Sequence, residues 1–540
     1  MPPIHKKLTT VLAVACISAL STSQAEVAAG SFDPAFGTAG RVAIDFENTP
    51  DYGDALALQS DGKMVIAGTM VKGVEDRFAV ARYEADGTPD LSFGQSGERV
   101  LEFGTNSSNA TCVAVQTDGK IVVGGRIFNR TLSQMVVARF TARGELDTTF
   151  NNVGYVTTSI SEAQDSVRSV ALQADGKIVT TGYVRNGTGF SVAVVRYLED
   201  GSLDSTFADG GISTISLGTG RDLAIQKDGR IVVAGNSSSM GFALFRYNSN
   251  GSLDTSFNGS GSALINLGGK DQQGNAVSLL PDGKILVGGQ SNGDLALLRY
   301  DLNGTLDTSF NGVGYVTTDV AVGEAALNDI DVNADGKITA VGYVSTANGR
   351  DQLLACYNPD GTLDTAFNGT GILQTKFSVG PDYGNGIAWQ NDGKIVAFGS
   401  SVFETSDMLL ARYAGPEEIA VQRQGGIDLV DGVGTVQIGG ALKNNRKFLT
   451  FTIINNGAAD LTNIEVSIGG RAVRDFKLTG HKITSLAGKS RHSFKVHFRP
   501  NKVGLRKATL RIRSSDSDES SFDIAIEGKV REKRGGRGRR

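Results

Sequence analysis

The chain has 540 residues, of which 40% are hydrophobic and 20% charged, and a net charge of −4. This length allows two or more domains, each with an ample core. The 70 glycines against 10 prolines, together with frequent Val, Ile and Thr, favour many short strands joined by tight turns. Helical heptads and long alanine-rich runs are absent, so we predict an all-β protein.

The first residues have the order of a secretory signal peptide. Lys6 and Lys7 precede the apolar run LTTVLAVACISAL, and small residues follow up to Ala25. The run is too short for a permanent membrane anchor, and no later segment reaches the required length. We therefore predict a signal peptide over 1–25 and an exported protein that is secreted, periplasmic or held at the cell surface. The word AVAC ending at Cys16 leaves open a bacterial lipoprotein cleavage site.

A repeat of 50 to 57 residues fills most of the remaining chain. Its most regular word is DGK or DGR, which follows a short alternating run and precedes a β-rich run with a glycine. A strand, an Asp-Gly turn and a strand predict a hairpin. A third strand ends in ARY or a relative, and a fourth follows a polar turn, so each unit has the four strands of a propeller blade. The DGK or DGR words begin at Asp61, Asp118, Asp175, Asp228, Asp282, Asp335 and Asp392.

The placement of a second repeated phrase predicts a closed ring. This phrase, such as LDTSFNGSG at Leu253, occurs seven times, and its first copy precedes any hairpin. The array ends at Tyr413 after three strands with no further copy. We therefore expect the strand near 41–46 to complete the last of seven blades, which would remove two exposed sheet edges. An open solenoid is the alternative, but neither end resembles a capping unit.

We interpret the repeated phrase as the corner between blades. Its Asp can hold backbone amides of the turn, and its Phe can fill the wedge between adjacent sheets. Arg, present in six of the seven ARY-type words, can pair with that Asp. A calcium site repeated in each blade is the rival interpretation, but the spacing of a calcium loop is missing. The phenylalanines are Phe36, Phe93, Phe150, Phe207, Phe257, Phe310 and Phe367.

The words LDTSFNGxG, LQxDGKIVVxG and ARYNxDG resemble the delta-60 repeat family of bacterial extracellular proteins, over roughly residues 31–413. The resemblance implies an exported bacterial propeller without a defined biochemical role. It departs locally in the second copy, PDLSFGQSG, and in a shortened fifth unit.

After Tyr413 the repeat stops, and runs such as FLTFTIIN and HSFKVHFRP alternate apolar with basic or polar residues. About seven strands in some 110 residues suit an immunoglobulin-like β-sandwich. The segment also resembles choice-of-anchor D domains, which implies an attachment or accessory module. The predicted domains are a seven-bladed propeller over 26–414, this sandwich over 415–530 and a basic disordered tail over 531–540.

Charge and histidine use limit the chemistry. Residues 417–540 have 24 basic and 13 acidic side chains, so an acidic propeller joins a basic C-terminal part. The basic part can contact an anionic surface polymer, whereas we expect no nucleic-acid partner in an exported protein. The four histidines are His5, His481, His492 and His497, so none lies in the propeller. This argues against Ser-His-Asp or Cys-His catalysis there and against an imidazole-bound metal, and we expect no cofactor. A bridge between Cys112 and Cys356 is not expected, since they lie four repeats apart.

One set of positions varies from unit to unit, as a specific site requires. If the strand before each DGK is innermost, its entry position would face the propeller axis, and Asp222, Asp329 and Asp331 would add an acidic cluster. We treat this polar ring as a hypothetical binding site, the alternative being that it only hydrates a channel. The entry positions are Asp54, Thr111, Arg168, Arg221, Asn275, Asn328 and Asn385.

Three functions remain open. The first is a non-catalytic exported binding or scaffold protein whose propeller presents a face to a protein or glycan and whose sandwich positions or attaches it. The second is a polysaccharide-acting enzyme that uses carboxylates. The third is a structural surface or matrix component.

Overall fold

The structure is a computed structural model. It describes residues 28–129, 132–187, 189–237, 241–320, 323–333, 335–390, 392–402, 406–415, 419–429, 435–439, 441–442, 446–457, 459–500, 502–516 and 521–531. The predicted signal peptide with Cys16, and the predicted tail apart from Arg531, lie outside these residues. No helix in the described part of the chain is long and apolar enough to cross a membrane.

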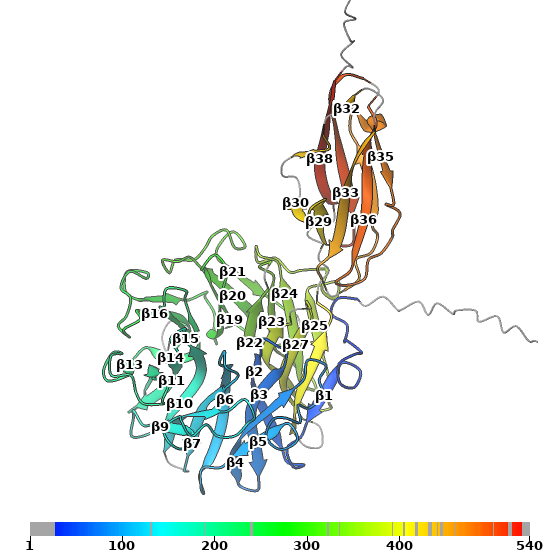
Figure 1. Cartoon of the computed structure of the whole chain (residues 1–540). Coiled ribbons are helices and arrows are strands. Elements are labelled where there is room, and N and C mark those ends of the chain that lie inside the picture. Colours follow the sequence, from blue (N-terminus) through cyan, green and yellow to red (C-terminus); the bar gives the residue numbers. More distant parts are fainter. Residues whose placement is uncertain are drawn as a thin grey trace, which may run out of the picture.

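The described residues are almost all strands and turns, and repeated four-stranded antiparallel sheets form a propeller-like array (Figure 1). The first sheet contains β2 (Asp51–Leu58), β3 (Met64–Lys72), β4 (Glu75–Tyr83) and β5 (Glu98–Leu101). The second contains β6 (Ser107–Val115), β7 (Ile121–Phe128), β8 (Ser133–Phe140) and β9 (Tyr155–Thr158). The third contains β10 (Asp165–Leu172), β11 (Ile178–Asn186), β12 (Gly189–Tyr197) and β13 (Ile212–Ile215).

The next three sheets follow the same order. The fourth contains β14 (Gly218–Ile225), β15 (Ile231–Ser237), β16 (Gly241–Tyr247) and β17 (Ser262–Ile265). The fifth contains β18 (Gln273–Leu279), β19 (Ile285–Ser291), β20 (Asp294–Tyr300) and β21 (Tyr315–Thr318). The sixth contains β22 (Ala325–Val332), β23 (Ile338–Thr346), β24 (Gly349–Tyr357) and β25 (Ile372–Thr375).

The last sheet combines both ends of the array, as the repeat order predicts. It contains β26 (Asp382–Trp389), β27 (Ile395–Val402), β28 (Ser406–Tyr413) and the N-terminal strand β1 (Arg41–Ile44). β1 pairs antiparallel with β28, from Arg41 opposite Ala411 to Ile44 opposite Met408. The expected docking of this strand is confirmed, and the blue strand β1 lies beside the last sheet in Figure 1.

The first strand of each sheet is innermost. These inner strands, β2, β6, β10, β14, β18, β22 and β26, contact one another in sequence, and β26 contacts β2. The last and first sheets also share a core in which Phe36, Met64 and Leu410 are fully buried. The two ends of the array are therefore packed against each other.

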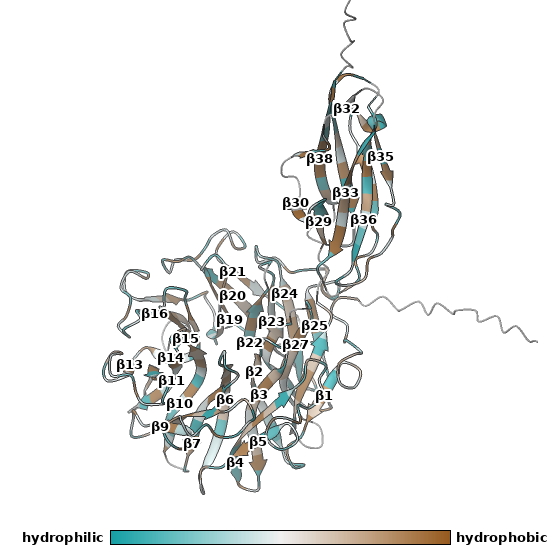
Figure 2. Ribbon diagram, viewed as in Figure 1, coloured by the Kyte–Doolittle hydropathy of each residue, from teal (hydrophilic) through white to brown (hydrophobic). Residues whose placement is uncertain are grey.

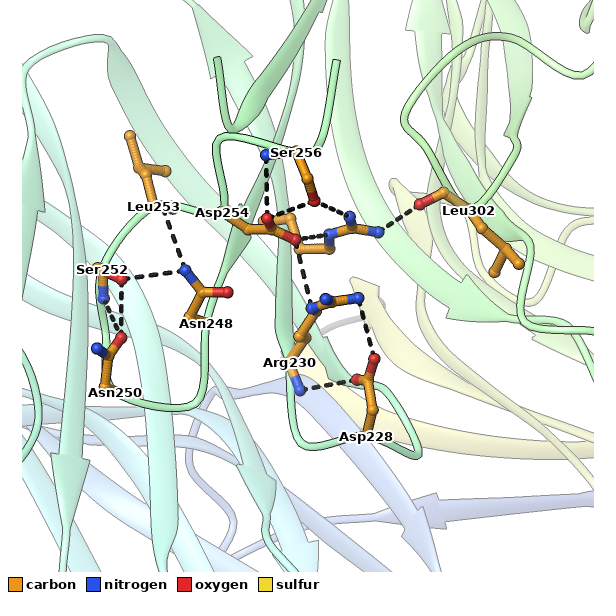
Figure 3. Close-up of polar contacts among 10 residues, drawn as sticks. Asp228, Arg230, Asn248, Asn250, Ser252, Leu253, Asp254, Ser256 and Leu302 are labelled. Carbon is orange, nitrogen blue, oxygen red and sulfur yellow. Dashed lines mark hydrogen bonds and ion pairs between the residues drawn. The ribbon is translucent and has the colours of Figure 1, made fainter. Parts of the chain in front are cut away.

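The corner between sheets has the structure that the repeated phrase predicts, as the fourth sheet illustrates. Asp254 Oδ1 accepts hydrogen bonds from the Ser256 amide (3.1 Å) and hydroxyl (2.6 Å), and Asp254 Oδ2 lies 2.8 Å from Arg246 Nε. The Arg246 guanidinium lies 4.4 Å from the ring centroid of Phe257 and donates to the Leu302 carbonyl of the next sheet. Figure 3 shows Asp254 with Ser256 and Leu302 around this corner. One arginine thus joins its own turn, the buried Phe and the neighbouring sheet.

The predicted pairing of Arg with Asp is confirmed in six sheets. The pairs are Arg82–Asp90, Arg139–Asp147, Arg196–Asp204, Arg246–Asp254, Arg299–Asp307 and Arg412–Asp33. Where Cys356 replaces the arginine, Lys337 Nζ lies 3.3 Å from Asp364 Oδ2, and both side chains are almost fully buried. All seven phenylalanines of the phrase have no exposed surface.

The cation of DGK or DGR also reaches the corner Asp in every sheet, which the sequence analysis missed. Figure 3 shows this for Arg230, whose Nε lies 3.3 Å from Asp254 Oδ2. The glycine of the same word has a positive φ, for example 84° at Gly229, so the turn both reverses the chain and delivers the cation. The pairs are Lys63–Asp90, Lys120–Asp147, Lys177–Asp204, Arg230–Asp254, Lys284–Asp307, Lys337–Asp364 and Lys394–Asp33.

The C-terminal strands form two five-membered sheets around one core. The first, in the order β30-β29-β33-β36-β35, contains β29 (Ile419–Arg423), β30 (Ile427–Leu429), β33 (Lys447–Asn455), β35 (Phe476–Thr479) and β36 (Arg491–Phe498). The second contains β31 (Thr435–Gln437), β34 (Glu465–Gly469), β37 (Gly504–Arg513) and β38 (Ser521–Arg531), and β32 (Ala441–Leu442) pairs with β38. A 3₁₀ turn, η1 (Val473–Asp475), precedes β35.

The sequence predicted about seven strands here, and the described residues contain ten. Three of the ten, β30, β31 and β32, are only two or three residues long, too short to show an alternating pattern. Phe451, Phe494 and Ile526 lie in the shared core. Figure 2 shows the alternation of hydrophilic and hydrophobic residues along β33 and β36. Arg531, expected in the tail, ends β38.

Candidate functional site

A β-bulge interrupts each inner strand at the same point. The pairing of β2 with β3, for example, skips from Gly53 to Ala55, which leaves Asp54 unpaired in the ladder. A bulge changes the direction in which a side chain points, and it recurs at functional rims of β-structures. The residues skipped in the seven sheets are Asp54, Thr111, Arg168, Arg221, Asn275, Asn328 and Asn385. The entry positions singled out by the sequence are therefore the bulged ones, although the bulge itself was not predicted.

The seven bulged residues line one cavity of about 460 Å³ between the inner strands. Asp222 and Asp329 line it as well, one residue after a bulge. Of the candidate site residues, Asp331 does not line this cavity. It lies two residues beyond Asp329 along β22, and its carboxylate accepts hydrogen bonds from the Val332 amide (2.8 Å) and the Trp389 amide (2.9 Å). The structure thus brings the rest of the hypothetical polar ring together.

A smaller pocket of about 240 Å³ adjoins this cavity, since both share Asp54, Thr111 and Arg168. It adds Tyr52 and Arg126, which the sequence analysis did not single out. Tyr52 lies two residues before Asp54 on β2, and Arg126 lies on β7, the second strand of its sheet, so neither is at the entry position that the sequence analysis used.

Four of the bulged side chains join neighbouring inner strands. Each donates a hydrogen bond to the carbonyl just before the bulge of the next sheet. These bonds are Thr111 Oγ1 to Val167 O (2.8 Å), Asn275 Nδ2 to Leu327 O (2.8 Å), Asn328 Nδ2 to Gly384 O (2.9 Å) and Asn385 Nδ2 to Gly53 O (2.7 Å). We call this set of bonds the inter-sheet belt. It satisfies buried carbonyls around the cavity.

The acidic cluster has a structural role of the same kind. Asp222 accepts from the Ser169 hydroxyl (2.7 Å) and the Val277 amide (2.8 Å), which belong to the two neighbouring inner strands. Asp329 accepts from the Ile387 amide (2.8 Å) on β26. Burial raises the pKa of both carboxyls, and the charge of Asp222 adds to the rise at Asp329.

Asp54, Arg168 and Arg221 are the charged members of the bulged set. Burial raises the pKa of Asp54 to about 7, against the opposing charges of Arg168 and Arg126. Burial, and then the charge of Arg168, lowers the pKa of Arg221. The cavity therefore holds two neighbouring cations and a carboxyl that titrates near neutral pH.

The cavity can hold a small polar molecule, and its volume lies within the usual range for ligand sites. Among the described residues no group of three or more His, Cys, Asp and Glu side chains could hold a metal ion. Cys112 and Cys356 are free and buried, and burial raises the pKa of each thiol.

A family model described as a domain of unknown function, DUF5122, beta-propeller, matches residues 59–93, 116–150, 173–207, 226–257, 280–310 and 334–367. These matches fall on the hairpin, the third strand and the corner of the first six sheets, and they support a β-propeller family for this chain. No curated protein matches the sequence.

Solved structures resemble each part at low identity. A catalytically inactive variant of virginiamycin B lyase from Staphylococcus aureus, solved with quinupristin, is 11% identical with a TM-score of 0.41, over 69% of this chain and 98% of that one. Sqt1 from Chaetomium thermophilum is 12% identical with a TM-score of 0.40, over 66% and 83%. The ASH/PapD-like domain of human CEP192 is 11% identical with a TM-score of 0.17, over 21% and 86%.

Proposed function

For a chain of this β-propeller family, we propose an exported, non-catalytic binding protein that holds a small polar ligand in the cavity between its inner strands. The proposed architecture is a closed seven-bladed propeller followed by an immunoglobulin-like sandwich of the choice-of-anchor D type, which positions or attaches it. The extracellular setting is proposed from the leader over 1–25 and from the resemblance to delta-60 repeats.

One observation supports the binding function above the others. The corner Asp and Phe repeat in every sheet because each corner has the same structural role, whereas the bulged position holds Asp, Thr, Arg or Asn in different sheets. All seven bulged side chains meet at one cavity. A ligand without the repeat symmetry of the scaffold needs different side chains at equivalent positions, all of which reach the same cavity.

The test is a binding screen with a variant that fills the cavity. Wild-type protein is screened by thermal shift and calorimetry against neutral sugars, sugar acids, amino acids and phosphates. Thr111→Tyr places a ring in the cavity, whereas Thr214→Tyr alters an exposed threonine of β13 and is the matched control. A ligand that Thr111→Tyr rejects and Thr214→Tyr retains supports the proposal. A screen without any such ligand refutes it.

The enzyme alternative draws on Asp54, since a carboxyl with a pKa of about 7 inside a cavity can exchange protons at neutral pH. Incubation of each binder from the screen with the protein, followed by mass spectrometry, separates the two functions. A product formed by wild type and lost in Asp54→Asn would replace the binding proposal with a catalytic one.

A second function, attachment to an anionic surface polymer, draws on one face of the sandwich. Lys477 and Lys495 are exposed on β35 and β36, and the Lys495 ammonium lies 4.8 Å from the ring centroid of Phe448. Phe448 is 51% exposed and pairs across the sheet with His497. The strands β33, β35 and β36 contain no acidic residue, so this face would attract a polyanion.

Retention of the full chain on a polygalacturonate resin tests the attachment. The double variant Lys477→Glu and Lys495→Glu should elute at clearly lower salt than wild type. Lys529→Glu, which changes an exposed lysine of β38, is the control and should elute later than the double variant. Equal elution of the two variants would refute a role for this face.

The third alternative, a matrix component, predicts oligomers that form through the acidic and basic parts and dissociate in salt. Light scattering that shows a monomer at both low and high salt would exclude it.

Mass spectrometry of the protein recovered from its host separates cleavage after Ala25 from lipidation at Cys16.

A further inference from the structure

Three of the seven bulged side chains are left out of the inter-sheet belt. In the second, fifth, sixth and seventh sheets the bulged residue is a neutral donor that binds the next sheet. In the first, third and fourth sheets it is Asp54, Arg168 or Arg221, and no such bond to the next carbonyl joins them among the described residues. The belt is therefore interrupted where charged groups face the cavity.

Arg168 and Arg221 occupy the same position on neighbouring inner strands, β10 and β14. The Nε atom of each is buried and has no hydrogen-bond partner among the described residues. The Arg168 guanidinium lies 5.4 Å from the ring centroid of Tyr183, and Arg221 Nη2 makes one long contact of 3.5 Å with Gln273 Oε1. Neither arginine forms an ion pair with a described carboxylate. Two guanidinium groups that form no direct ion pair are costly to hold in one cavity unless an anion binds them.

We propose that Arg168 and Arg221 together bind the carboxylate of a small hydroxylated organic acid, of the sugar-acid class, in the axial cavity. This inference rests on the proposed binding function and names its ligand class. Guanidinium groups match carboxylate geometry and form charge-assisted hydrogen bonds with it. The other bulged residues are Asp, Thr and Asn, which can hydrogen-bond hydroxyl groups, and the apolar lining residues, such as Leu56 and Val113, expose little surface to the cavity.

A carboxylate fits this cavity better than a phosphate. Asp54, Asp222 and Asp329 line the same cavity and would repel a second negative charge. Burial raises the pKa of all three carboxyls and so lowers their negative charge, and the charge that remains repels a singly charged ligand less than a doubly charged one.

Calorimetry with D-glucuronate, its neutral counterpart D-glucose and inorganic phosphate tests the proposal on the full mature chain. Wild type should bind glucuronate at least tenfold more tightly than glucose or phosphate. Arg168→Gln and Arg221→Gln should each weaken glucuronate binding about tenfold or more, because each removes charged hydrogen bonds. Arg143→Gln, which changes an exposed arginine, is the matched control and should bind as wild type does.

Each outcome decides the inference. Tighter binding of glucose or phosphate than of glucuronate overturns it, as does glucuronate binding that both glutamine variants retain. Melting curves establish that the variants are folded, and Arg221→Lys, which keeps the charge, should weaken binding less than Arg221→Gln does. If the wider screen finds a neutral ligand that Thr111→Tyr rejects, the anion assignment fails while the proposed binding function stands. If Thr111→Tyr rejects no compound, both fail.

Discussion

Asp54 offers a direct test of how the cavity affects stability. Its pKa is raised from 3.8 to about 7 because the folded chain buries it. The folded state therefore holds the proton more tightly than the unfolded state, and unfolding releases a proton between these two pH values. The contribution of Asp54 to the free energy of unfolding therefore falls as the pH rises from about 4 to about 7.

The substitution Asp54→Asn removes this penalty. The full shift corresponds to about 4 kcal/mol, at 1.36 kcal/mol for each pKa unit. Since Asp54 lies at a water-accessible cavity, solvent screening reduces this to about 1–2 kcal/mol. The amide of the new Asn can also donate a hydrogen bond to the Ala110 carbonyl, the acceptor equivalent to those of the inter-sheet belt. This bond adds about 1 kcal/mol to the free energy of unfolding of the variant. We expect the variant to gain about 2–3 kcal/mol at pH 8 and about 1 kcal/mol at pH 4.

Urea unfolding of the propeller at pH 4 and pH 8 measures the difference. Asp209→Asn is the control, because Asp209 is exposed in a turn, and it should change stability little at either pH. A gain for Asp54→Asn that is equal at the two pH values, or a loss at pH 8, would refute the reasoning.

The remaining predictions concern the corners and the closure. Arg246→Ala should lower the free energy of unfolding in urea by about 3 kcal/mol, because it removes a buried ion pair, a cation–π contact and a hydrogen bond to the next sheet. Arg230→Ala removes the more exposed cation beside the same Asp254 and should lower it by less than about 1 kcal/mol. Equal losses would contradict these roles. Lys337→Ala should lower the free energy of unfolding by about 3 kcal/mol, because Cys356 replaces the corner arginine and Lys337 pairs with the buried Asp364. Lys120→Ala should lower it by less than about 1 kcal/mol, because Arg139 still pairs with Asp147. Ile44→Asp should destabilise the propeller by about 3 kcal/mol or more and promote aggregation in size-exclusion chromatography, because Ile44 is 1% exposed in the closing strand. Ala43→Asp, at the exposed neighbour, should change neither, and similar behaviour of the two variants would argue against closure by β1.

The sequence by itself determined the repeated sheets, their corners and the docking of the N-terminal strand. Each of these follows from local words. The glycine of every DGK or DGR word has a positive φ, and an Arg, an Asp and a Phe meet at the same spacing in five of the sheets. The first copy of the repeated phrase precedes any hairpin, and the last unit has no copy after it. This order alone placed β1 beside β28. The sequence also named the variable entry positions.

Only the tertiary structure decided what those entry positions do. Thr111, Asn275 and Arg168 are equivalent in the repeat, yet the first two bind a carbonyl 52 or more residues away and the third keeps a buried nitrogen unpartnered. Asp331, grouped with Asp329 by sequence, lies two residues further along β22 and does not line the cavity, although both carboxylates accept a hydrogen bond from a backbone amide of β26. The partner of such a side chain lies in the neighbouring sheet and so belongs to another repeat. No local pattern specifies which atoms of the side chain that partner will satisfy.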